Sequence, residues 1–167
     1  LEGFLGDVAV SLAAAPLANA DDPRIAWLDG LLRAPPEHKF LLLTRCQPKL
    51  HAIEEALRLR SGVALARFHE GLGIVQRDRH AAHFADPGGA RLLLCTEIGS
   101  EGRNFQFAHH LVLWDLPLDP DLLEQRIGRL DRIGQRGDVQ LHHYAVEGSA
   151  QHALAQRRPL RGGVARL

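Results

Sequence analysis

The sequence predicts an α/β domain built in layers around a mainly parallel β-sheet. Short, continuous apolar runs such as Lys39–Thr44 and Arg91–Cys95 are typical of strands that are buried on both faces. Segments with apolar residues at helical spacing alternate with these runs along the chain, as parallel strands require. A length of 167 residues is ordinary for a single domain of this class.

In the first half of the chain, three expected helices alternate with two expected strands. Asp22 and Pro23 are typical of a helix N-cap followed by proline at the first helical position. The helix that they begin is expected to stop at Pro35-Pro36. The elements that follow are a strand at Lys39–Thr44, an amphipathic helix at Pro48–Ser61, a strand at Val63–Phe68 and a polar helix at Ile74–Phe84.

In the second half, the strand at Arg91–Cys95 leads into a glycine-rich loop at Thr96–Asn104. Asp119 is expected to cap a helix that starts at Pro120 and runs to about Ile133. The remaining elements are strands at His110–Trp114 and Val139–Val146 and a last helix at Ser149–Arg157.

Three parts of the chain differ in composition. Residues 1–21 form an N-terminal apolar segment that we expect to be linked to an upstream region, because the chain starts at Leu1 and contains no methionine. Residues 22–157 carry the alternating elements of the α/β domain. Residues 158–167, with one proline, two glycines and three arginines, are expected to be a frayed basic tail.

Composition excludes several classes of protein. The 20 basic residues balance the 20 acidic ones, so any nucleic-acid-binding groove must be local. Two cysteines cannot make a disulfide framework or a four-cysteine zinc site, and a reducing, cytoplasmic setting is expected. There is no apolar run long enough for a membrane span, and no GxxxxGK[ST] phosphate loop.

The segment after Asp119 carries the strongest functional signal. If it is helical, Gln125, Arg129, Arg132 and Arg136 fall on one side, within about 60° of one another. Like charges at this spacing destabilise a helix slightly. A polyanion such as a phosphate chain, bound against the row of arginines, would offset this repulsion. Ordinary salt bridges on a solvated helix face explain the same spacing equally well. Arg126 lies outside this row and is expected to form a local ion pair.

The glycine-rich loop gives a second, weaker signal. Gly99 and Gly102 permit a close approach of the backbone to a ligand, whereas Thr96 and Asn104 offer a hydroxyl and an amide. A tight turn without any ligand is the plain alternative. In parallel sheets, ligands bind at the carboxyl ends of the strands, where this loop is expected to lie.

Residues Leu92–Gln135, LLLCTEIGSEGRNFQFAHHLVLWDLPLDPDLLEQRIGRLDRIGQ, closely resemble the second motor lobe of Swi/Snf-type superfamily 2 ATPases. The resemblance is nearest to the bacterial subgroup that is associated with RNA polymerase, and it extends over about residues 22–147. It implies a RecA-like three-layer sandwich, the helicase C-terminal lobe. In this family two such lobes clamp ATP between them and move along double-stranded nucleic acid.

The resemblance also implies roles for residues near the end of the segment. Gln125–Gln135 matches motif VI, in which Arg129 and Arg132 occupy the arginine-finger positions that reach ATP on the first lobe. Gln125 matches the residue that faces the nucleotide cleft.

Thr96–Asn104 matches motif V of the same family. Thr96 corresponds to a contact with the nucleic-acid backbone, whereas Gly102 and Asn104 correspond to positions at the nucleotide cleft. Arg77 follows a block that resembles the next conserved motif and is assigned to nucleic-acid binding, with a helix-surface ion pair as its alternative.

As an ATP-driven translocase lobe, the chain is expected to act within a longer protein. ATP and Mg²⁺ would be held mainly by the first lobe, so the isolated chain should not hydrolyse ATP. Expected partners are that lobe, double-stranded nucleic acid with DNA favoured, and RNA polymerase, in the cytoplasm at the nucleoid. The alternative is a catalytically silent RecA-like module that docks a protein partner such as RNA polymerase.

Departures from the wider family argue against chromatin remodelling. Ser100, Phe105 and Leu118-Asp119 stand where many remodellers have other residues, and Asp119 is expected to cap a helix. The ten histidines do not form a recognisable ligand set with a cysteine or carboxylate, so no metal site is predicted.

Overall fold

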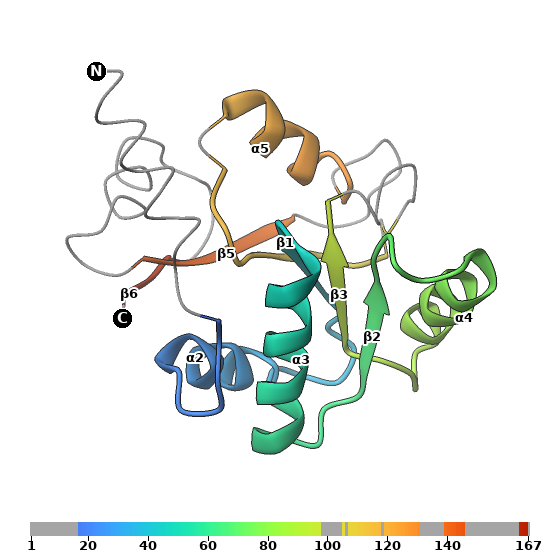
Figure 1. Ribbon diagram of the computed structural model, residues 1–167, viewed down its shortest axis with the longest axis horizontal. Coiled ribbons are helices and arrows are strands. Elements are labelled where there is room, and N and C mark those ends of the chain that lie inside the picture. The colour runs from blue at the N-terminus through green and yellow to red at the C-terminus, as the bar shows by residue number, and fades with distance from the viewer. Residues whose placement is uncertain are drawn as a thin grey trace.

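A computed structural model describes residues 17–97, 105, 107–117, 119–130, 139–145 and 164–166. Its strands form one six-stranded sheet in the order β2-β3-β1-β4-β5-β6, and every neighbouring pair is parallel. Figure 1 shows the helices packed around this sheet, with α5 beyond the carboxyl end of β3.

As far as β5, the described elements follow the predicted order along the chain. The helices are α2 (Pro23–Leu31), α3 (Gln47–Arg60), α4 (Ile74–Ala85) and α5 (Pro120–Ile127). The strands are β1 (Phe40–Thr44), β2 (Leu65–Phe68), β3 (Leu92–Thr96), β4 (His110–Leu113), β5 (Gln140–Ala145) and β6 (Val164–Arg166).

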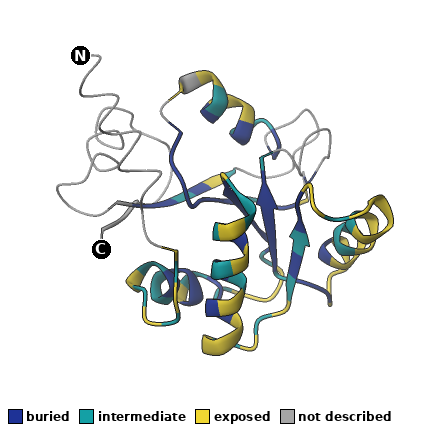
Figure 2. Cartoon of the chain, viewed as in Figure 1, coloured by how far each residue is buried: buried dark blue, intermediate teal, exposed yellow. Residues whose placement is uncertain are grey.

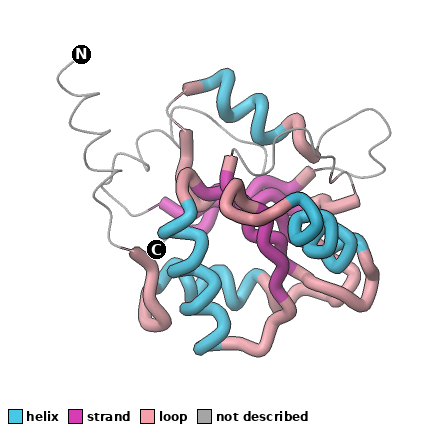
Figure 3. The backbone as a smooth tube through the Cα atoms, turned by 45° about the vertical axis from the view of Figure 1, so that its right-hand side comes forward, coloured by secondary structure: helices cyan, strands magenta, loops and turns pink. Residues whose placement is uncertain are grey.

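Alternate residues of the central strands pack into two separate cores, one on each face of the sheet. Phe40 and Leu42 of β1 share a cluster with α2 and α3, whereas Leu41 and Leu43 share a cluster with Phe84 of α4 and with α5. All five residues of β1 and of β3 are buried, as Figure 2 shows for the middle of the sheet. In Figure 3 the strands lie between the helices, which gives the three layers that were predicted.

Helix starts follow the capping rules. The Asp22 carboxylate accepts a hydrogen bond from the backbone N–H of Arg24, and the Asp119 carboxylate accepts one from the N–H of Asp121, each at 2.9 Å. These bonds satisfy N–H groups that have no partner inside the first helical turn. Asp119 is therefore a helix cap, as predicted.

The end of α5 corrects the sequence-based prediction. The helix stops at Ile127 rather than near Ile133, because Gly128 takes the C-cap position and its N–H bonds to the carbonyl of Glu124 at 2.8 Å. Glycine is a poor helix former, and residues 128–130 continue as a turn. Arg129 therefore lies beyond the helix that was predicted to carry it.

Three residues of the C-terminal tail also differ from the prediction. Val164–Arg166 forms β6, paired with His143–Ala145 of β5, so these three residues are not frayed, because the exposed edge of β5 offers them backbone hydrogen bonds. The apolar segment 1–16 and the predicted helix at 149–157 lie outside the described residues. Within the described ranges, no helix is long and apolar enough to cross a membrane.

Candidate functional site at the carboxyl edge of the sheet

Polar residues gather where the central parallel strands end. Thr44 closes β1 and Thr96 closes β3, and the two are direct partners in the register of the sheet. Asp115 follows β4 by two residues, and Glu97 follows β3 directly. Since all of these strands are parallel, their carboxyl ends bring the four residues to one edge, where α/β proteins bind ligands.

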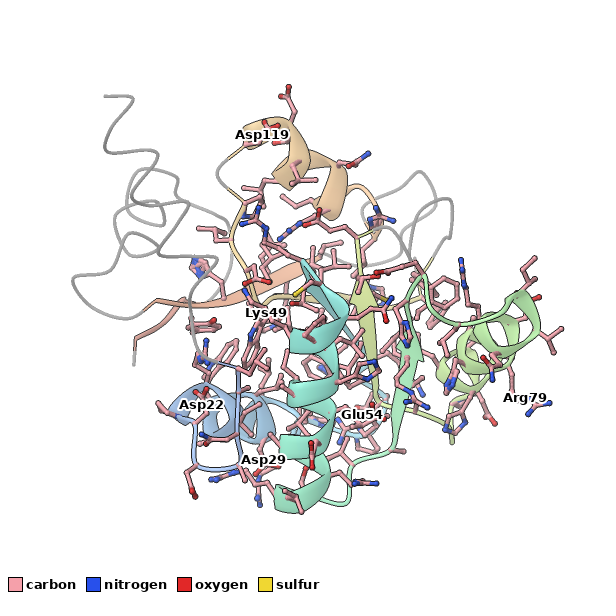
Figure 4. All side chains as sticks on the ribbon, in the orientation of Figure 1. Asp22, Asp29, Lys49, Glu54, Arg79 and Asp119 are labelled. Atoms are coloured by element: carbon pink, nitrogen blue, oxygen red, sulfur yellow. The ribbon has the colours of Figure 1, made fainter. Side chains whose placement is uncertain are left out.

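Asp115 joins three elements at this edge. Its carboxylate accepts hydrogen bonds from the Thr44 hydroxyl at 2.9 Å, from the backbone N–H of Arg45 at 3.0 Å and from the Lys49 ammonium at 2.6 Å. The side chains of Asp115 and Lys49 are only 7% and 12% exposed. Lys49 lies near the start of α3 (Figure 4), so Asp115 fixes the ends of β1 and β4 and the start of α3 relative to one another.

Thr96 is oriented by Glu70, two residues after β2. The Thr96 hydroxyl is buried and donates to the Glu70 carboxylate at 2.5 Å. Burial raises the pKa of Glu70, but hydrogen bonds from Thr96, the Glu70 backbone and Gln47 outweigh it and leave this pKa below its ordinary value. Glu70 therefore stays ionised at neutral pH and holds the Thr96 hydroxyl at the end of β3.

Arg77 of α4 binds the turn that carries Glu70. Its guanidinium donates to the carbonyl oxygens of Leu72 at 2.8 Å and of Glu70 at 3.1 Å. Instead of the helix-surface ion pair that was the alternative for Arg77, its side chain forms two hydrogen bonds to main-chain oxygens. Arg77 supports the loop after β2, and through it the partner of Thr96.

Arg126 is the local ion-pairing residue that sequence analysis expected. Its guanidinium is 1% exposed, forms an ion pair with the Glu97 carboxylate and donates to the backbone carbonyl of Asp115. Burial, together with the nearby cations Arg45 and Arg129, lowers the pKa of Arg126 to about 10. Arg126 therefore remains charged at neutral pH.

Gln125 and Arg129 differ in their surroundings. Gln125, on α5, is exposed. Arg129 is only 8% exposed, and its Nη2 donates to the backbone carbonyl of Glu97 at 3.4 Å. The prediction that Arg129 projects outward from a helical row is wrong here, because the helix ends before it and the turn directs it back towards the end of β3.

Some residues of the predicted site lie outside the described part of the chain. They are Gly102, Asn104 and Arg132, and Arg136 of the predicted arginine row lies outside it as well.

Sequence reasoning missed Asp115 and Glu97. Both carried a usable signal, because each is an acidic residue within two positions of the end of a largely apolar strand. An ionised side chain placed there must find partners at the same edge of the sheet.

Three histidines form a separate hydrogen-bonded chain at the opposite ends of the strands. Nδ1 of His38 lies 2.7 Å from Nε2 of His110, and Nδ1 of His110 lies 2.9 Å from Nε2 of His142. Each pair needs one protonated and one unprotonated nitrogen, so the chain suits neutral rings. Among the described residues, no group of three or more histidine, cysteine or acidic side chains is arranged to hold a metal ion.

We expect this chain of histidines to make the fold sensitive to acid. Burial, with smaller contributions from neighbouring histidines, lowers the pKa of both His110 and His142 to about 4. As the pH falls from about 6.5 to about 4, the unfolded chain binds protons that the folded chain does not, so the free energy of unfolding decreases. Urea unfolding at a series of pH values measures the slope of the free energy of unfolding against pH.

His142→Gln is expected to make that slope shallower between pH 6.5 and pH 4. His51→Gln, which changes an exposed histidine of α3, is the matched control and should leave it unchanged. Equal slopes for His142→Gln and the unmodified chain would rule out the histidine chain as the source of acid sensitivity.

Comparison with known proteins shows which family the chain matches. Residues 23–134 match the family described as the helicase conserved C-terminal domain, which covers α2 through α5 and all of the edge described above. The chain belongs to this family. This chain is 58% identical over 136 residues to the RNA polymerase-associated protein RapA of Pseudomonas aeruginosa (strain LESB58). The match takes in 81% of this chain and only 14% of that relative's length.

Solved structures confirm the RecA-like fold of the helicase C-terminal domain. The C-terminal part of the Fun30 ATPase domain matches with a TM-score of 0.70 at 18% identity, over 81% of this chain and 45% of that one. The E. coli DEAD-box protein SrmB, solved with the regulator of ribonuclease activity RraA, matches with a TM-score of 0.68 at 19% identity. The second match covers 90% of this chain and 86% of the SrmB chain.

Proposed function

We propose that this chain is the second motor lobe of an ATP-dependent nucleic-acid translocase similar to RapA. The observation that carries the proposal is the position of motif VI, whose Gln125, Arg126 and Arg129 lie at the carboxyl edge of a RecA-like sheet. The 58% identity to RapA supports the same assignment. The chain would complete an ATPase site whose other half belongs to a first lobe.

In this proposal the lobe contributes positive charge to phosphoryl transfer. ATP and Mg²⁺ would be held mainly by the first lobe, and the metal ion would neutralise part of the phosphate charge when bound. Arg129 and Arg132 would supply guanidinium groups to the transferring phosphoryl, since these stay charged and bind its oxygens through a planar fork of donors. The buried Arg129 would have to exchange its bond to the Glu97 carbonyl for the phosphate when the lobes close.

The other predicted residues would divide between the nucleotide and the nucleic acid. Gln125, Gly102 and Asn104 would line the nucleotide cleft, and the exposure of Gln125 supports this role. To contact the nucleic-acid backbone, the buried Thr96 hydroxyl would have to exchange its bond to Glu70, and Arg77 would act near it. The bond from Thr96 to Glu70, and those from Arg77 to the turn of Glu70, fit residues that position this edge for a strand of nucleic acid.

The proposal extends to partners and setting. Lobe closure on ATP would shift the balance between open and closed forms, and so move the protein along double-stranded nucleic acid, with DNA favoured. Similarity to the RNA polymerase-associated protein RapA supports an association with RNA polymerase, which would place the protein in the cytoplasm at the nucleoid.

The same similarity also favours the second candidate, a catalytically silent module that docks RNA polymerase. The gene sequence upstream of Leu1 discriminates between the two. A phosphate-binding GxxxxGK[ST] loop together with an acidic DExH-type motif supports the motor, whereas the absence of both supports the docking module.

The purified 167-residue chain is expected to show no ATP turnover above background, because the proposal gives it no site that holds the nucleotide. Release of phosphate from ATP in the presence of double-stranded DNA measures this. The full-length protein, assayed in parallel, should turn over ATP. Sustained hydrolysis by the chain alone would contradict the assignment as half of a site.

A further inference from the structure

Arg126 occupies an unusual place for a charged side chain. It is 1% exposed, and it lies in the last turn of α5, at the carboxyl edge of the sheet. Removing a guanidinium from water is costly, and an apolar residue of similar size is often as stabilising or more so. We therefore expect Arg126 to contribute by fixing the relative positions of the groups that its guanidinium binds.

The two ends of the Arg126 guanidinium bind groups that follow different strands. One nitrogen donates to the backbone carbonyl of Asp115, beyond β4, and another pairs with the carboxylate of Glu97, directly after β3. In the sheet these two strands are not neighbours, since β1 lies between them. Arg126 thus reaches across the end of β1 and ties both flanking strand ends to α5.

The same contacts set the position of Arg129. The α5 helix ends one residue after Arg126, and the turn that follows is closed by backbone bonds from Arg129 to the carbonyl of Arg126 at 3.3 Å and from Leu130 to that of Ile127 at 3.0 Å. Leu130 is fully buried in the core. Glu97 is thus contacted by Arg126 through its carboxylate and by Arg129 through its carbonyl.

We propose that Arg126 and Glu97 form a positioning pair that holds the Arg129 turn in register with the ends of β3 and β4. Neither residue contacts the nucleotide in this account. The pair acts through Arg129, and so the inference rests on the function proposed above. Lysine cannot replace Arg126, because a single ammonium does not reach two acceptors in two directions as the guanidinium fork does.

The test uses the full-length protein with ATP and double-stranded DNA. Arg126→Lys and Glu97→Gln are each expected to lower kcat by about tenfold to a hundredfold, as a small misplacement of a reacting group does, with KM for ATP within about twofold. Because the two act as one unit, the double variant should lose about as much as the larger single loss. Hydrogen exchange in peptides covering residues 128–130 should become faster in each variant while the rest of the lobe is unchanged.

The matched controls are Arg67→Lys and Glu54→Gln, a second arginine–glutamate pair that joins β2 to α3 with Nη1 and Oε2 3.4 Å apart. They should leave kcat and exchange at residues 128–130 unchanged. An unchanged kcat for Arg126→Lys, or a loss for Arg126→Lys with none for Glu97→Gln, overturns the positioning pair. A loss of activity that only follows a general loss of folded protein overturns it as well.

Arg129→Ala separates this inference from the proposed function. If Arg129→Ala leaves turnover unchanged, the proposed role of Arg129 fails, whatever the pair does. If Arg129→Ala lowers turnover while both pair variants retain it, the proposed function stands and the positioning pair is wrong.

Discussion

Replacing Arg132 by alanine in the full-length protein is expected to lower ATP turnover by a factor on the order of 10³ or more, the usual contribution of an arginine finger. Arg129→Ala is expected to act in the same direction. The loss should appear in kcat, because a guanidinium that binds the transferring phosphoryl does so mainly in the transition state. Nucleotide affinity, measured by titration with a non-hydrolysable ATP analogue, should change far less.

The control for this experiment is Arg79→Ala, which removes an exposed arginine from α4 (Figure 4). It changes the net charge by the same amount and should leave kcat unaltered. If Arg132→Ala turns over ATP at the rate of the unmodified protein, Arg132 is not a finger, and motif VI must act in another way.

The largest effect on stability is expected at Asp115. Asp115→Ala removes a carboxylate that accepts three hydrogen bonds and leaves the largely buried Lys49 ammonium and the Thr44 hydroxyl without this partner. Breaking a buried ion pair from one side costs about 3–5 kcal/mol in free energy of unfolding. Asp115→Asn should cost less, because an amide oxygen can still accept from Thr44.

Urea unfolding of the chain at pH 7 measures both Asp115 variants. Asp121→Ala is the control, since Asp121 is an exposed acidic residue of the first turn of α5 and its loss should cost about 0.3–1 kcal/mol. A cost for Asp115→Ala no larger than that of the control would mean that Asp115 does not hold the ends of β1 and β4 together.

The fold could be predicted because its central strands are short apolar runs with little competing interpretation. Lys39–Thr44 and Arg91–Cys95 became β1 and β3 within a residue of their predicted bounds, since a run buried on both faces suits the middle of a parallel sheet. The order of the strands did not follow from the sequence, because parallel pairing depends on contacts between distant segments. The strand β6 was missed because Val164–Arg166 is too short to stand out in a glycine- and arginine-rich tail.

The site was predictable where one residue has one local role. Asp119 caps α5 and Arg126 forms an ion pair, as expected from their positions in the sequence. The orientation of Arg129 could not be predicted by extending the helical period, because Gly128 ends the helix within that period. Nor could the contacts of Asp115 and Glu97, which join residues from elements far apart in the chain.

In the proposed mechanism, this lobe stabilises the transition state of a phosphoryl group that is held by another lobe. The most direct measurement is the affinity of the full-length protein for ADP with aluminium fluoride, which imitates that transition state, compared with its affinity for ADP alone. In Arg132→Ala, affinity for the aluminium fluoride complex should fall by about a hundredfold or more while that for ADP stays within a few-fold. Equal affinities of Arg132→Ala and the unmodified protein for both ligands would contradict the account.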